Sequence, residues 1–210
     1  MIIHIILCLV IGYIFGCFST AYVIGKLNKV DIRKYGSGNA GTTNALRTLG
    51  AKAGAVTLLG DVLKAVIPIL LIRFLIFPDV EYVRLLTVYA GLGVVLGHNY
   101  PVWLGFKGGK GIAATGGVML AFDPWIVPVG LPLFILVVAI TRYVSLGSML
   151  VAVLFPIWIG IRFPGNLHML MVSLVFTALA FIKHRTNIIR LLNGTENKIG
   201  QRVKIENKDK

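Results

Sequence analysis

The sequence predicts an all-α polytopic membrane protein. Of its 210 residues, 57% are hydrophobic and only 14% are charged, whereas soluble domains contain about 25% charged residues. The mean hydropathy is +0.85, and the apolar residues gather into long stretches separated by short polar segments. The chain is nevertheless strongly basic, with 21 Lys and Arg residues against 8 Asp and Glu. The placement of these cations therefore carries information about topology and ligands.

Seven stretches are apolar enough to be transmembrane helices, which need about 20 mainly apolar residues. The first lacks the basic start of a signal peptide and stays apolar for longer than one. The fourth is short and rich in small residues, so five to seven crossings are defensible, and we predict about seven. The expected spans are 2–25, 53–77, 82–97, 111–123, 125–141, 144–162 and 167–183.

Four prolines fall inside these spans, one in the second, two in the fifth and one in the sixth. They do not argue against the assignment, because neighbouring helices can satisfy the carbonyl groups that a proline frees in a membrane. The second span also holds two ionisable residues, Asp61 and Lys64, which are three positions apart and share a helix face. A structural ion pair and a support for the site are equally good interpretations of these two.

The Lys and Arg residues predict the orientation, because cytoplasmic loops carry an excess of them. With the N-terminus outside, all but four of the 21 fall in inner loops and the C-terminal tail. We therefore expect an outside N-terminus and a cytoplasmic C-terminus. We divide the chain into a transmembrane helical domain, residues 1–183, and a cytoplasmic tail, residues 184–210, that begins with a short interfacial helix.

The first of three polar segments on the inner side, residues 36–47, contains the spacing G-x-G-x-x-G. As a dinucleotide signature it is weak, because no strand precedes it. Glycines nevertheless let backbone N–H groups approach an anion, and an arginine offers a fork suited to phosphate. The alternative is a glycine turn facing water. The candidate ligand-binding residues here are Gly36, Ser37, Gly38, Asn39, Gly41, Thr43, Asn44 and Arg47.

The second segment, residues 97–111, interleaves two lysines with glycines, without the spacing of a Walker A loop. An inner loop would contain lysines in any case, but each glycine costs backbone entropy on ordering, so we favour a phosphate site. His98 is a candidate acid, base or phosphate ligand. The other candidates are Lys107, Gly108, Gly109, Lys110 and Gly111.

The third segment, residues 184–196, holds His184 and Asn187 on one helix face. Taken by itself, it is better explained as a basic tail on anionic headgroups. Its further polar residues are Arg185, Arg190 and Glu196. No cluster with metal-ligand spacing appears, no cofactor is implied, and nucleic acid is disfavoured because the cations adjoin spans. Three cation-rich segments on one face predict phosphorylated ligands, without separating lipid chemistry from anion transport.

These three segments resemble the motifs of the bacterial acyl-phosphate:glycerol-3-phosphate acyltransferase family of the PlsY type. The family pattern reads G-S-G-N-x-G-A-T-N-x-x-R, then G-H-x-x-P-x-x-x-x-F-K-G-G-K-G, then H-R-x-N-I-x-R-L-x-x-G-x-E. The chain matches nearly every position, with Thr42 in place of the usual alanine. The glycine, aspartate and lysine of 60–64 are a further point of similarity.

The resemblance implies a seven-helix enzyme of the bacterial inner membrane with a cytoplasmic active site. It would transfer a fatty acyl group from acyl phosphate to the 1-hydroxyl of glycerol 3-phosphate, the first step of phospholipid synthesis, giving lysophosphatidic acid and phosphate. Membrane lipids would surround it, and no obligate protein partner is evident. The alternative is a non-enzymatic membrane transporter or binder of organic phosphate or anionic lipid. The catalytic residues carried over are Ser37, Arg47, Lys107, His184 and Asn187.

Overall fold

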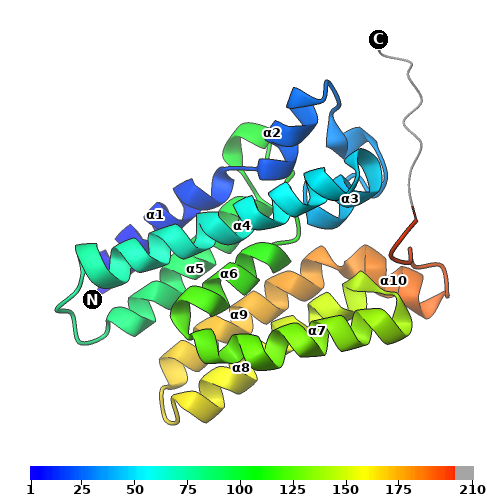
Figure 1. Ribbon diagram of the computed structural model, residues 1–210. Coiled ribbons are helices and arrows are strands. Elements are labelled where there is room, and N and C mark those ends of the chain that lie inside the picture. The colour runs from blue at the N-terminus through cyan, green and yellow to red at the C-terminus, as the bar shows by residue number, and fades with distance from the viewer. Residues whose placement is uncertain (202–210) are drawn as a thin grey trace.

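The computed structural model describes residues 1–201, which form helices joined by short turns and contain no β-strand (Figure 1). The all-α prediction is therefore confirmed for this part of the chain. The last part of the predicted tail, 202–210, lies outside the described residues. The α-helices are α1 Ile2–Cys17, α2 Thr20–Leu27, α3 Thr42–Leu49, α4 Ala51–Leu71, α5 Val83–Asn99, α6 Ile112–Phe122, α7 Val127–Thr141, α8 Val144–Arg162, α9 Leu167–Lys183 and α10 Arg185–Leu192.

Each expected span contains all or most of at least one helix, but not every helix is long enough to cross a membrane unaided. Among the described residues, four segments have the required length and apolarity, or five if α9 and α10 form one bent span. With 11 residues, α6 is about 16 Å long, roughly half the hydrocarbon thickness. The prediction of seven crossings is thus not tested. The four segments are Ile2–Leu27, Ala51–Ile76, Pro124–Thr141 and Val144–Arg162.

The first expected span is broken. Phe18 has an extended backbone conformation and ends α1, while the Ser19 side chain accepts a hydrogen bond from Tyr22 N and begins α2. The second span also changes character, because α4 continues into a π-helical turn, Ile72–Ile76, after Pro68. A proline removes a backbone donor and crowds the preceding turn, which accounts for a local change of helix type.

Helix α5 lies at the centre of the bundle and is buried along most of its length. It packs against α1 through glycines: a Cβ at Gly12 would lie 2.0 Å from Ala90 O, and one at Gly93 would lie 2.3 Å from Leu9 O. Small residues allow such backbone contact between helices in membranes. On its other sides α5 contacts the main core, which includes Phe155.

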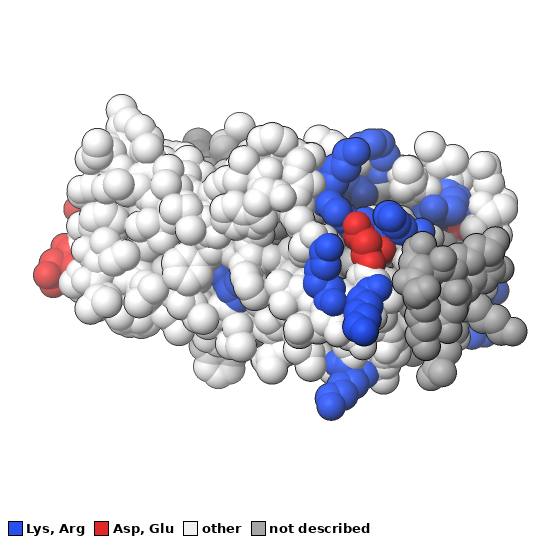
Figure 2. Space-filling view, turned by 90° about the horizontal axis from the view of Figure 1, so that it is seen from above, with Lys and Arg blue, Asp and Glu red and all other residues white. Residues whose placement is uncertain are grey.

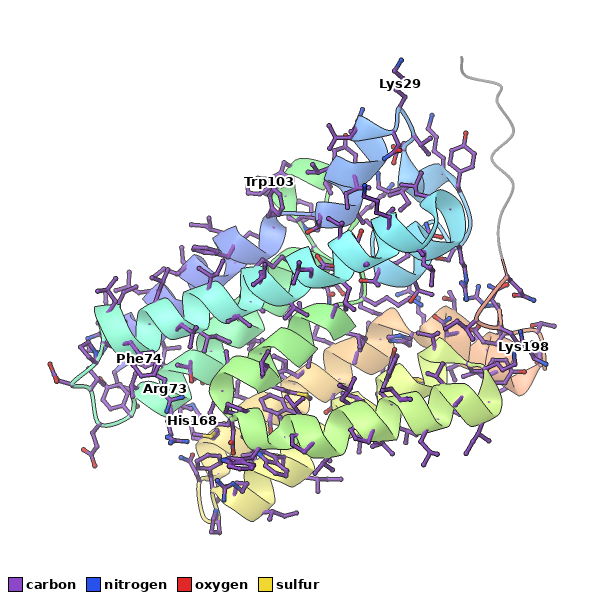
Figure 3. All side chains as sticks on the ribbon, in the orientation of Figure 1. Lys29, Arg73, Phe74, Trp103, His168 and Lys198 are labelled. Carbon is purple, nitrogen blue, oxygen red and sulfur yellow. The ribbon has the colours of Figure 1, made fainter. Side chains whose placement is uncertain are left out.

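The polar segments gather at one end of the bundle. The N-terminus and the turns after α4 and α8 lie at one end, whereas α2, α3 and α10 lie at the other (Figure 1). Figure 2 shows Lys and Arg side chains concentrated over the half that holds α2, α3 and α10. In Figure 3, Lys29 and Lys198 mark this end, and Arg73 and His168 mark the opposite one. The three candidate segments therefore share one end of the molecule.

Candidate active site

The first wall of the site is the loop before α3, and the Asn44 side chain organises it. Asn44 Oδ1 accepts a hydrogen bond from Ser37 N at 2.9 Å, and its Nδ2 donates to the carbonyl oxygens of Ile32 and Tyr35 at 3.0 and 3.1 Å. Gly36 has a φ of +61°, and a Cβ there would lie 2.3 Å from Asn44 Oδ1. The buried Asn44 thus supports the loop, while Ser37 and Gly38 are exposed on it.

The second wall is the glycine–lysine loop, whose backbone lies directly against the end of α5. Gly109 N donates to His98 O at 3.0 Å, and Gly108 N donates to Asn99 O at 3.3 Å. A Cβ on Gly108 would lie 2.0 Å from His98 O, and one on Gly109 would lie 2.0 Å from His98 Nε2. The glycines are therefore required for close packing, which fixes the backbone that carries Lys110.

The third wall comes from α10 and the turn that follows it. Asn187 Oδ1 accepts a hydrogen bond from Lys110 Nζ, and Asn187 Nδ2 donates to Glu196 Oε1 at 2.7 Å. The same carboxylate accepts from Ser145 Oγ at 2.9 Å and, through Oε2, from Arg190 Nε at 2.9 Å. Although burial acts in the opposite direction, these hydrogen bonds hold the pKa of Glu196 below its usual value. Glu196 is therefore an ionised anchor for this wall.

A pocket of about 180 Å³ lies between these walls, and four of its eight lining residues are Lys or Arg. Among residues 1–201, no acidic side chain lines it. Its volume is below the roughly 300–1,000 Å³ of pockets for drug-sized ligands, so it suits a small polar group. Burial lowers the pKa of Lys110 to about 8, with Glu196 acting in the opposite direction. The lining residues are Ser37, Gly38, Asn39, Lys110, Lys183, Arg185, Thr186 and Arg190.

Arg47 lies beside the pocket without lining it. Its Nη2 donates to Asn197 O at 3.3 Å, and its Nε is buried without a hydrogen-bond partner among the described residues. Burial lowers the pKa of this guanidinium, and the charge of Glu196 opposes the shift. A half-buried cation with an unused donor is available for a further acceptor.

His184 is buried at the corner between α9 and α10. Its Nδ1 lies 2.7 Å from Ala180 O. A carbonyl oxygen only accepts, so Nδ1 carries the hydrogen, and Nε2 is the ring nitrogen left to act as an acceptor. Like Asn187 and Arg47, His184 belongs to the surroundings of the pocket rather than to its lining.

The remaining predicted residues lie elsewhere. Lys107 is exposed outside the pocket. His98 is buried behind Gly109, where its Nδ1 lies 2.8 Å from Lys64 Nζ. Lys64 and Asp61 form the ion pair that their spacing allows, with 2.8 Å between Nζ and Oδ1. Seven other predicted residues lie in the same sequence segments as lining residues but do not line the pocket: Gly36, Gly41, Thr43, Asn44, Gly108, Gly109 and Gly111.

Two lining residues were not among the predicted set, Lys183 and Thr186. Lys183 Nζ donates to Asn99 O at 3.0 Å and lies 4.4 Å from the centre of the Tyr100 ring. Lys183 directly precedes His184 of the third segment, and this adjacency could have pointed to it. A lysine at the end of a span is, however, also typical of a cytoplasmic helix end. Within residues 1–201, no group of three or more His, Cys, Asp or Glu residues could hold a metal ion.

Comparison with known proteins identifies the family of this chain. A family model described as glycerol-3-phosphate acyltransferase matches residues 6–194. The chain belongs to this family. A glycerol-3-phosphate acyltransferase of Clostridioides difficile (strain 630) is 50% identical over 198 residues, covering 92% of this chain and 94% of the relative. One from Thermoanaerobacter pseudethanolicus is 43% identical over 202 residues, covering 96% and 98%.

Two solved structures of PlsY, an integral membrane glycerol 3-phosphate acyltransferase, have the same fold. The glycerol 3-phosphate form is 35% identical, has a TM-score of 0.84, and is matched over 93% of this chain and 96% of that one. The lysophosphatidic acid form is 34% identical, with a TM-score of 0.82 and coverage of 94% and 96%. The resemblance in the three motifs is therefore confirmed, and the chain is an acyltransferase of the PlsY family.

Proposed function

We propose that this acyltransferase moves a fatty acyl group from acyl phosphate to the 1-hydroxyl of glycerol 3-phosphate, giving lysophosphatidic acid and inorganic phosphate. The observation that carries the proposal is the pocket with four cationic lining residues and no acidic one. The acceptor is supported by the PlsY structures described in glycerol 3-phosphate and lysophosphatidic acid forms. The choice of acyl phosphate as donor rests on the motif resemblance and on the charge of the pocket.

Both substrates carry a phosphate group, and we assign the pocket, which suits one small polar group, to the phosphate of one of them while the other lies beside it. Arg185 and Arg190 line one side of the pocket, Ser37 and Gly38 line the other, and Lys110 lies between them in the hydrogen-bond network. Cationic forks and exposed loop amides are the usual donors to phosphate oxygens. We assign phosphate binding to these groups together with Arg47 and Lys107, and placement of the reacting groups to His184 and Asn187.

The reaction needs little help in bond making, because acyl phosphate is a mixed anhydride with a good leaving group. The 1-hydroxyl oxygen forms a bond to the acyl carbon, the bond from that carbon to the phosphate oxygen breaks, and phosphate departs. The hydroxyl proton passes to the departing phosphate. The protein contributes orientation of the two substrates and neutralisation of their charges, which are large terms in catalysis.

The ionisation of Glu196 and the burial of His184 both support this substrate-assisted route. Glu196 is held ionised by three hydrogen-bond donors, so it is a poor base. His184 keeps Nε2 free, but the side chain is buried and does not line the pocket. A general base at His184 or His98 is the rival mechanism. Acyl groups trapped on Ser37 or His184 after mixing with radiolabelled acyl phosphate would refute direct transfer.

We further place the pocket at the cytoplasmic face of the bacterial inner membrane, with seven crossings and the N-terminus outside. The cationic end of the molecule supports this orientation, because cytoplasmic segments carry the excess of Lys and Arg (Figure 2). Glycerol 3-phosphate is then taken from the cytosol and the acyl donor from the bilayer. Cysteine labelling at Lys29 and Asp79, which lie on opposite sides of α4 in the sequence, tests the topology.

A direct assay tests the function. Purified protein is mixed with palmitoyl phosphate, and phosphate release is measured with and without glycerol 3-phosphate. Release that depends on glycerol 3-phosphate, together with formation of lysophosphatidic acid, is the expected result. Formation of lysophosphatidic acid is then measured with acyl-CoA or acylated acyl carrier protein in place of palmitoyl phosphate, which fixes the donor. Binding of glycerol 3-phosphate without any acyl transfer would support a transporter or binder instead.

A further inference from the structure

A buried polar cluster links α4 and α5 to the break between α1 and α2. At its centre, Lys64 Nζ lies 2.7 Å from Phe18 O, 2.8 Å from Asp61 Oδ1 and 2.8 Å from His98 Nδ1. Lys64, Asp61 and His98 are 5%, 1% and 6% exposed. Phe18 O and His98 Nδ1 accept hydrogen bonds from the ammonium group, and Asp61 Oδ1 contacts it as an ion pair, without a hydrogen bond among the described residues.

The contact with Phe18 explains why the first helix can break inside the membrane. The carbonyls at the C-terminal end of a helix lack intrahelical partners, and lipid offers no replacement. Lys64 supplies a donor to Phe18 O. The cluster therefore holds together the helix break, α4 and α5.

The contact with His98 fixes the state of its ring. Lys64 Nζ is only a donor, so His98 Nδ1 is an acceptor and Nε2 carries the hydrogen. Asp61 Oδ1 is farther from His98 Nδ1, at 3.6 Å, than it is from Lys64 Nζ. The Lys64 contact thus decides both the tautomer and the direction of the imidazole.

The opposite edge of the same ring faces the glycine–lysine loop. A Cβ on Gly109 would lie 2.0 Å from His98 Nε2 and 2.9 Å from Ala40 O, so the ring, the loop and the segment before α3 are in close contact. The residue after Gly109 is Lys110, which lines the pocket. The cluster is therefore connected to the pocket by the contact between the His98 ring and Gly109.

We propose that Lys64, neutralised by Asp61, is a positioning residue that acts through His98 to set the glycine–lysine loop and thereby the place of Lys110 in the pocket. Lys64 itself does not touch substrate. The proposal rests on the proposed function, because it assumes that the pocket binds the substrates. It assigns a role in the reaction to an ion pair buried in the helix bundle.

The test uses Asp61→Asn/Lys64→Met, because Lys64→Met alone leaves a buried carboxylate without its partner. We expect kcat/KM for glycerol 3-phosphate to fall about 100-fold, the effect of a misplacement of roughly 1 Å. The second readout is the pH dependence of Lys110 acylation by a trace amine reagent, followed by peptide mass spectrometry. Its midpoint should rise from about 8 in the unchanged protein toward the value of a solvated lysine.

The matched control is Asp123→Asn. Asp123 is another buried carboxylate, which accepts hydrogen bonds from Trp158 Nε1 at 3.0 Å and Arg162 Nε at 3.3 Å, away from the pocket lining. This variant should lose thermal stability while kcat/KM and the Lys110 midpoint stay unchanged. An equal shift in the control would show a general loss of packing and would overturn the proposal.

A double-mutant cycle tests whether Lys64 acts through His98. In His98→Asn, the amide oxygen can replace Nδ1 as an acceptor for Lys64, but the edge that faces Gly109 is lost. We expect this variant to lose activity too, and adding Asp61→Asn/Lys64→Met to it to cost little more. Additive losses, or a Lys110 midpoint that stays near 8 in both variants, would contradict the proposal. The midpoint can be read in protein without acyl transfer, so failure of the function and of this inference are distinguishable.

Discussion

Asn187 donates a hydrogen bond to Glu196 Oε1 at 2.7 Å, while its own Oδ1 accepts one from Lys110. One amide thus connects an anionic anchor to a cation of the pocket. Both hydrogen-bonding directions of the amide are used, so its orientation is determined by its partners. The network thereby holds the charges of Lys110, Glu196 and Arg190 in one arrangement beside the pocket.

Glu196→Gln should weaken the network without changing its shape. Its new amide group presents hydrogens to at least one of the donors that now contact the carboxylate, so a hydrogen bond to a charged group is lost. Such bonds contribute about 1.5–3 kcal/mol to stability. We expect a lower Tm and at least tenfold lower kcat/KM. Glu81→Gln, an exposed residue outside the site, is the control and should change neither.

Arg47→Ala should abolish most activity while the protein still inserts. A charged partner removed from a partly buried pair typically costs about 2–5 kcal/mol, so we expect a loss of kcat/KM of about 25-fold or more. Arg73→Ala at the opposite end of the bundle should have normal turnover (Figure 3). Near-normal turnover in Arg47→Ala would remove this residue from the site.

Lys107→Ala and Lys110→Ala should both lose activity, but with different salt dependence. Lys107 is exposed, so salt screens its attraction for anions, and its contribution should shrink at high ionic strength. Lys110 is fixed by Asn187 in the pocket, so its loss should persist. Kinetics at low and high sodium chloride compare the two. Equal salt dependence would contradict the difference in placement.

Activity should decline as the pH rises through about 8. Burial lowers the pKa of Lys110 to about 8, so its positive charge is present below that pH and lost above it. The phosphate of the substrate has its second pKa near 6 and is already a dianion, so it does not cause the decline. The pH profile of kcat/KM reports the free enzyme. Lys110→Arg should move the decline to higher pH, and an unchanged profile would exclude Lys110 as its origin.

Gly36→Ala should disturb the first wall of the pocket. A Cβ there would lie 2.3 Å from Asn44 Oδ1, and the φ of +61° disfavours any residue with a side chain. We expect at least tenfold lower kcat/KM. Gly116→Ala is the matched control, because no atom lies within 4 Å of its added Cβ. Similar losses in both variants would show that the contact with Asn44 is unimportant.

The positions of the helices could be predicted because hydrophobic length is a local property. The break at Phe18 could not, because it depends on a hydrogen bond from Lys64, 46 positions away. The eight-residue α2 and α3 were also missed, since such short helices are stabilised by their surroundings rather than by their own sequence.

The pocket lining agrees with the sequence motifs where neighbouring residues lie in one loop, and departs from them where the fold decides exposure. Ser37 and Lys110 line the pocket, as phosphate-binding motifs suggested. His98 looked equally available in the sequence, yet it is buried, because the inward face of α5 depends on helices distant in sequence. Lys183 was overlooked for the converse reason, since a basic residue at the end of a span has an ordinary topological explanation.

The pocket joins residues 37–39 to residues 183–190, which lie near the two ends of the described chain. During synthesis, Ser37 therefore leaves the ribosome long before its partners have been translated. No pocket exists until α9 and α10 have emerged from the ribosome. A chain that ends before α9 therefore lacks half of the pocket's lining residues.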